Sequence, residues 1–72
     1  MKLKPVESSN LLEWGWQKRT FAVRFKSSPQ NIYLYPDTPS YLWAAAHRAK
    51  SKGKFFGRHL RKAPFVKHSF KP

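Results

Sequence analysis

The sequence predicts a small α+β domain, in which a three-stranded antiparallel meander packs against two short helices. Apolar and polar residues alternate over residues 12–16 and again over 21–25, and this period of two is typical of half-buried strands. Residues 31–35 are rich in strand formers, and residues 42–60 then carry apolar side chains at helical spacing. A run of strands followed by a run of helices is typical of the α+β class.

The first two strands are expected to pair as a hairpin. The apolar side chains of the first lie on one face, and those of the second do the same, because side chains alternate between the faces of a strand. A short polar connection, Gln17-Lys18-Arg19, can join the two in antiparallel order. The third strand, over residues 31–35, ends before Pro36, and the buried side chains expected of the hairpin are Leu12, Trp14, Trp16, Phe21, Val23 and Phe25.

The first helix is predicted to begin near Pro39 and to run to about Ala49. Asp37 or Thr38 is expected to be its N-cap, and a proline fits the first turn because its missing N–H needs no partner there. A narrow face of small apolar side chains would let this helix lie close to the sheet; its members are Leu42, Ala45, Ala46 and Ala49.

The second helix is predicted from a cap at Ser51 to about Arg61. It would bury Phe55, Phe56 and Leu60. Gly53 and Gly57 weaken it by roughly 1 kcal/mol each relative to alanine.

Residues 8–62 are expected to form a single compact domain. Residues 1–7 are predicted to be a flexible N-terminal segment, and residues 63–72, with two prolines and no apolar pattern, a basic C-terminal tail. A chain of 72 residues without cysteine has a thin core that no disulfide or thiolate zinc site reinforces. Its aromatic residues, 17% of the chain, must supply that core. No stretch of about 18 apolar residues occurs, so a membrane partner is not expected.

Positive charge is concentrated in the last third of the chain. The formal net charge is +12, and residues 47–72 hold nine lysines and arginines, all three histidines and no acid. Such a field attracts polyanions, which include nucleic acid, acidic protein surfaces and anionic membranes. A solvated, solubilising surface is the alternative, although such surfaces usually mix both signs.

The residues needed for catalysis or metal binding are scarce. Glu7, Glu13 and Asp37 are the only acids, and no two of them have the spacing of an acid–base pair. The histidines at 47, 59 and 68 lie too far apart for a compact zinc motif and have no thiol beside them. We therefore expect a protein without enzymatic activity, bound metal or cofactor.

The candidate binding residues are cations between residues 48 and 62. They alternate across the predicted junction of the two helices, where a helix N-terminus also presents free N–H groups to an anion. A phosphate and a partner's carboxylates are equally compatible with this pattern. Arg58, Arg61 and Lys62 recur at i, i+3 and i+4, which places them on one helical face. The whole set is Arg48, Lys50, Lys52, Lys54, Arg58, Arg61 and Lys62.

Accessory contacts are predicted on the sheet. Arg24 and Lys26 lie on one side of their strand, and Tyr33 and Tyr35 share one side of theirs. Aromatic side chains on a basic sheet can stack on nucleic-acid bases. In so small a protein the same rings are also needed as core beneath the helices, so both roles stay open.

The chain resembles the KTSC domain family over most of its length. The segment Ser51-Lys52-Gly53-Lys54-Phe55-Phe56 is the most specific part of this resemblance, and a turn glycine usual in the family is replaced here by Ser28 or Pro29. The resemblance implies a compact α+β domain without catalytic activity that is proposed to bind RNA. Its further parts are Ser8-Ser9-Asn10-Leu11, Trp14-Gly15-Trp16, Val23-Arg24-Phe25, Tyr33-Leu34-Tyr35, Pro39, Ala49-Lys50 and Leu60-Arg61.

In size and basic charge the chain also resembles a small protein of lytic bacteriophages that binds the host's RNA polymerase. That resemblance implies inhibition of initiation, antitermination, contact with the β′ subunit and a location in the bacterial host's cytoplasm. The leading prediction is therefore a monomeric, non-enzymatic transcription regulator whose basic face meets RNA or acidic polymerase residues. The alternative is a free-standing RNA-binding module of the KTSC type.

Overall fold

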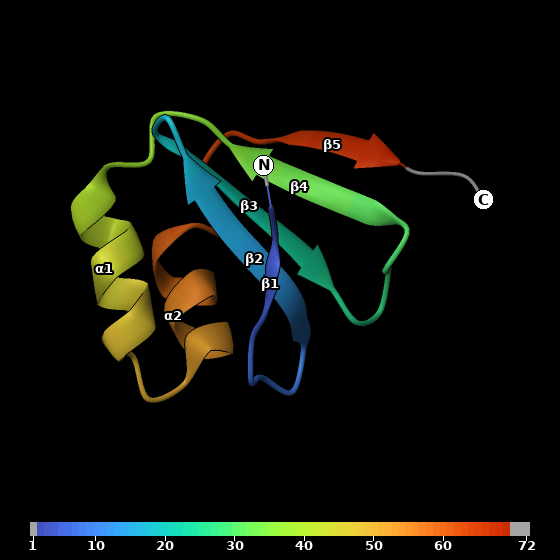
Figure 1. Cartoon of the computed structure of the whole chain (residues 1–72), viewed down its shortest axis with the longest axis horizontal. Coiled ribbons are helices and arrows are strands. Elements are labelled where there is room, and N and C mark those ends of the chain that lie inside the picture. The colour runs from blue at the N-terminus through green and yellow to red at the C-terminus, as the bar shows by residue number, and fades with distance from the viewer. Residues whose placement is uncertain (1, 70–72) are drawn as a thin grey trace.

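Five antiparallel strands and two helices make up the computed structural model, which describes residues 2–69 (Figure 1). The order of strands in the sheet is their order in the chain, and both helices lie in the connection between the last two strands. The α+β class, the central meander and the two helices agree with the prediction. No helix in the described part of the chain is long and apolar enough to cross a membrane. The elements are β1 (Lys4–Pro5), β2 (Leu11–Gln17), β3 (Thr20–Phe25), β4 (Asn31–Tyr35), α1 (Ser40–Arg48), α2 (Lys52–His59) and β5 (Val66–Ser69).

The predicted number of strands is wrong, because the sheet has two edge strands that the sequence did not indicate. β1 pairs with β2, and β5 pairs with β4. They lie in the segments expected outside the domain, 1–7 and 63–72, of which Met1 and residues 70–72 are not described. β1 has two residues, and β5 has one apolar residue among four exposed ones. Neither strand can therefore display a hydrophobic period.

β2 and β3 form the predicted hairpin, closed by Lys18 and Arg19. Both residues have positive φ, 50° and 63°, as a two-residue type I′ turn requires. Toward the other end of the hairpin, the pairing shifts register between Leu11 and Glu13, which is a β-bulge. The bulge turns Leu11 into the core, so Leu11 is fully buried and the predicted Leu12 is not.

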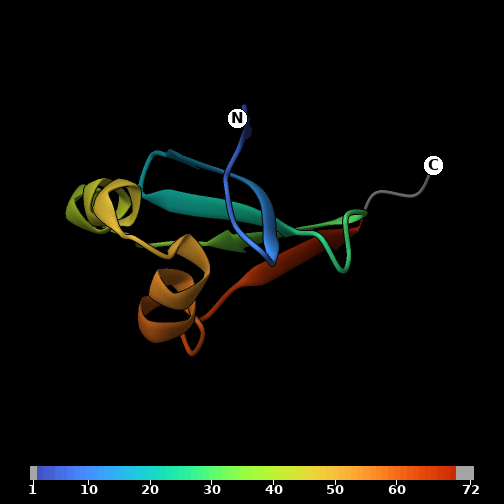
Figure 2. The ribbon, with the colours of Figure 1, turned by 90° about the horizontal axis from the view of Figure 1, so that it is seen from below.

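The core lies between one face of the sheet and the two helices (Figure 2). The ring of Phe56, on α2, lies 5.3 Å from the rings of Phe25 and Tyr35. From α1, the Trp43 ring lies 5.4 Å from that of Phe21. These rings interlock mainly edge to face, the arrangement that aromatic pairs prefer. The buried members are Leu11, Trp14, Phe21, Val23, Tyr35, Ala46, Phe56 and Leu60.

Neither Asp37 nor Thr38 caps α1, contrary to the prediction. The N-cap is Pro39, in extended conformation and without a side-chain hydrogen bond to the helix. Thr38 is buried, and its hydroxyl donates to the Tyr35 carbonyl at 2.9 Å. Its own carbonyl accepts a 2.9 Å hydrogen bond from the indole N–H of Trp16. Thr38 therefore ties the link between β4 and α1 to β2.

α2 begins at the predicted cap. The Ser51 hydroxyl accepts a hydrogen bond from the backbone N–H of Lys54 at 3.3 Å. The helix ends at His59, two residues before the predicted end, and the N–H of Leu60 still donates to the Phe56 carbonyl at 2.8 Å. Phe56 and Leu60 are buried as predicted, whereas Phe55 is only half-buried.

Candidate functional site

Three of the predicted cations surround a hollow at the junction of α1 and α2. Lys54 and Arg58 lie four residues apart on one side of α2, Lys50 precedes that helix in the junction, and all three side chains are exposed. The hollow has a volume of about 330 Å³. We call these three residues the α2 basic face. Across residues 2–69, ion pairing joins Arg24 to Glu13 and involves none of these three.

Two aromatic rings line the same hollow, and the sequence reasoning missed their role. The rings of Phe55 and His59 lie 4.4 Å apart with an interplanar angle of 38°. They are i and i+4 on α2, a spacing that could have revealed the pair. An aromatic ring face between cations can contact a nucleic-acid base while the cations contact its phosphates.

The rest of the predicted set is dispersed. Arg48 is the last residue of α1, and Arg61 and Lys62 lie in the turn that follows α2. All three are exposed. The prediction that Arg61 and Lys62 share a helical face with Arg58 is wrong, because α2 ends at His59.

Lys52 has a structural contact that the sequence did not indicate. Its ammonium group donates to the carbonyl of Ala49 at 2.7 Å and to that of His47 at 3.1 Å. A cation at this position satisfies carbonyl groups left open at the C-terminus of α1. Its contribution is therefore to the stability of the helix junction.

We expect Lys52→Ala to lower the free energy of unfolding by roughly 1–2 kcal/mol, because two carbonyl groups lose a charged donor. Lys54→Ala is the matched control, since that side chain is exposed one turn into the same helix. Urea unfolding followed by circular dichroism measures both. Equal midpoints for the two variants would contradict the structural role of Lys52.

The four accessory residues do not form one surface. Arg24 pairs with Glu13 at 2.9 Å on the sheet face opposite the helices, and Lys26 is exposed beyond the end of β3. Tyr33 and Tyr35 point toward the helices. Tyr35 is 4% exposed, so it is a core residue and cannot stack on a base. Burial, and secondarily the nearby Tyr33, raise the pKa of the Tyr35 hydroxyl.

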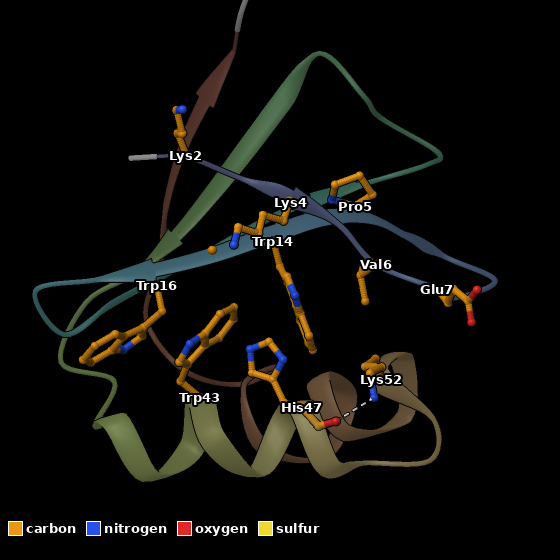
Figure 3. A pocket seen from close by; sticks show the side chains of 11 residues that line it. Lys2, Lys4, Pro5, Val6, Glu7, Trp14, Trp16, Trp43, His47 and Lys52 are labelled. Atoms are coloured by element: carbon orange, nitrogen blue, oxygen red, sulfur yellow. Dashed lines mark hydrogen bonds between the residues drawn. The ribbon is translucent and has the colours of Figure 1, made fainter.

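A second, larger hollow lies between β1, β2 and α1. It has a volume of about 580 Å³, and Figure 3 shows Trp43 and His47 projecting from α1 toward Trp14. The rings of Trp43 and His47 lie 4.3 Å apart, and each lies within 5.2 Å of the Trp14 ring. Trp16 also lines this hollow, and so do the lysines of the N-terminal segment. Residues 2–7, which form the other wall of this hollow, were predicted to lie outside the domain.

The helix junction also touches the loop before β2. A Cβ atom at Gly53 would overlap the side-chain oxygen of Asn10 and lie 3.2 Å from the Ser8 hydroxyl. The Ser8 hydroxyl donates to that same Asn10 oxygen at 2.9 Å and accepts from the Leu11 N–H. Two segments quoted for the family resemblance, Ser8 to Leu11 and Ala49 to Phe56, therefore meet at Gly53.

The family model of the KTSC domain matches residues 7–65. The chain belongs to the KTSC domain family. The crystal structure of a KTSC domain protein from Yersinia pestis superposes on this KTSC chain with a TM-score of 0.76 and 28% sequence identity, covering 97% of each. No curated protein matches the chain. Within residues 2–69, no group of three or more histidine, aspartate or glutamate side chains is placed to hold a metal ion.

The two glycines of α2 in this KTSC domain should respond oppositely to alanine. Gly57 has no atom near the place of a Cβ, so Gly57→Ala is expected to stabilise the protein by roughly 0.5–1 kcal/mol through helix propensity. At Gly53 the new methyl group displaces Asn10 from its bond with Ser8, and Gly53→Ala should end about 1–2 kcal/mol less stable than Gly57→Ala. Thermal unfolding measures the difference. An equal increase in stability in both variants would contradict this expectation, because the loop that holds Asn10 would then move aside without a cost in free energy.

Proposed function

We propose that this KTSC domain is a non-catalytic RNA-binding module whose contact surface is the α2 basic face. The observation that carries the proposal is the hollow at the helix junction, where Lys50, Lys54 and Arg58 stand beside the ring pair of Phe55 and His59. The cations can contact phosphates, and a ring face of the pair can contact a base. The implied RNA binding of the family agrees with this arrangement.

The three cations of the α2 basic face have no carboxylate partner among the described residues. Because their charge is not neutralised within the fold, it is available to an external polyanion. Arg48 adds positive charge at the junction, and Arg61 and Lys62 add it beyond the other end of α2.

Binding of bacterial RNA polymerase, with initiation inhibited or antitermination promoted, stays a prediction. Acidic residues of a polymerase subunit could pair with the same cations, and aromatic rings also occur at protein interfaces. Base stacking would use the faces of the rings together with the cations, which supports RNA as the proposed partner.

A salt titration tests the proposal directly. Labelled single-stranded RNA is titrated with the protein at several salt concentrations, and anisotropy reports the affinity. If three cations contact phosphates, the logarithm of the affinity should fall with the logarithm of salt with a slope of about −2 or steeper. If the protein does not bind RNA at 50 mM salt, the proposal is refuted.

A pull-down from bacterial lysate separates the two partners. The tagged protein is incubated with lysate, with and without exhaustive nuclease, and eluted along a salt gradient. An RNA-binding module should lose its partners to the nuclease. Retention of RNA polymerase after nuclease would establish the polymerase-binding role instead.

A further inference from the structure

The larger hollow, between β1, β2 and α1, gathers every tryptophan of the chain. The protein has three, and Trp14, Trp16 and Trp43 all line this space together with His47 (Figure 3). Trp14 is buried, whereas Trp16 and Trp43 are half-buried, so part of their ring surface faces the hollow. The indole N–H of Trp16 already donates to the Thr38 carbonyl. The face of the Trp16 ring is therefore what this residue can offer to a ligand. The walls are therefore aromatic surfaces.

Lysines border this aromatic space on the side of β1. Lys2 and Lys4 are exposed and line the hollow, and Figure 3 places both on the strand side, with Glu7 toward the opposite end. Lys52 also lines it, but its ammonium group is engaged with carbonyls of α1. The two ends of the hollow therefore differ in charge. An anion is attracted to the end with Lys2 and Lys4 and is repelled by Glu7 at the other end.

We propose that this hollow is a subsite for one unpaired base of a single-stranded nucleic acid. The base stacks on the Trp43 and His47 side of the aromatic wall, and its phosphate lies at Lys2 and Lys4. A volume of about 580 Å³ lies in the range of sites that hold small organic ligands. A base in a duplex is stacked between its neighbours and cannot enter, so the subsite selects single strands.

The subsite adjoins the α2 basic face, and the inference therefore rests on the proposed function. Lys52 lines this hollow, and its neighbour Ser51 lines the smaller one beside α2. A strand held by the cations of α2 thus passes the helix junction close to the entrance of the aromatic hollow. The proposed function supplies affinity for phosphates, and the subsite adds the requirement for an unpaired base.

Intrinsic tryptophan fluorescence reports occupancy of this subsite, because all three indoles line it. The protein is titrated with a single-stranded RNA oligonucleotide and with the duplex of the same sequence, and anisotropy of a label on the RNA is followed in parallel. We expect the single strand to bind at least tenfold more tightly and to quench the fluorescence. The duplex should bind without that quenching.

His47→Ala and His68→Ala form a matched pair of variants. Both histidines are exposed, but His47 lines the hollow and His68 lies on β5 at the far edge of the sheet. We expect His47→Ala to reduce single-strand affinity about tenfold and duplex affinity little, and His68→Ala to change neither. Circular dichroism confirms that both variants are folded.

The outcomes separate the subsite from the proposed function. If single strand and duplex bind alike without quenching, the subsite is refuted while RNA binding stands. If neither binds, both are refuted. Quenching by a glutamate-rich peptide but not by the oligonucleotide would assign the hollow to an acidic protein partner and overturn the inference.

Discussion

Phe56→Ala should lower the free energy of unfolding by about 3–5 kcal/mol, the usual cost of emptying a buried aromatic site. Phe56 is 6% exposed, and its ring contacts those of Phe25, Tyr35 and Phe21. A chain of this length has a total stability on the order of 4–11 kcal/mol. The substitution therefore removes a large share of it.

The neighbouring Phe55 provides a matched control. It is half-buried at the margin of the core, and its ring packs against that of His59, so Phe55→Ala is expected to lose about 1 kcal/mol. Urea unfolding of both variants, followed by near-ultraviolet circular dichroism, measures the difference. A larger loss in Phe55→Ala would mean that α2 is rotated relative to the described packing.

Reversing the α2 basic face should have the largest effect on binding. Replacement of Lys50, Lys54 and Arg58 by glutamate substitutes three repulsive contacts for three attractive ones, and we expect RNA affinity to fall by roughly 100-fold or more at physiological salt. The fold should persist, because all three side chains are exposed and unpaired within the described residues. Anisotropy measures the affinity, and thermal unfolding checks the fold.

A control variant with the same net charge distinguishes an effect of the α2 basic face from an effect of the protein's overall charge. Glutamate at Lys18, Arg19 and Lys67 also lowers the net charge from +12 to +6, but these exposed residues lie at the hairpin turn and on β5. We expect less than a tenfold loss for this variant. If both triple variants lost affinity equally, the binding would follow overall charge, and the α2 basic face would not be the site.

The core and the helix cap could be predicted because their signals are local. Alternation over β3 placed Phe21 and Val23 inside, and Ser51 before a helical pattern marked the start of α2. The bulge at Leu12 could not be predicted, since an inserted residue shifts the face of every residue before it. The edge strands were missed because exposed strands have no apolar period.

The candidate site was harder to predict for a different reason. Residue type suggested seven cations, but only the fold shows that Lys52 is bonded to α1 and that Arg61 lies beyond α2. The aromatic hollow depends on β1 lying beside β2 in the sheet, where Lys4 pairs with Trp14. Such a contact between distant segments leaves no pattern in either segment.

The order of the strands has a consequence for how the chain folds. β1 to β4 each pair with their neighbour in sequence, so these pairings close short loops at low entropic cost. β5, in contrast, pairs with β4 only after the 30 residues between Tyr35 and Val66, which include both helices, have been brought into place. We expect the meander to form early and β5 to dock last, and its amides to exchange with solvent deuterium before those of β3. β5 can therefore separate from β4 and pair with it again while the helix junction and its cations stay in place.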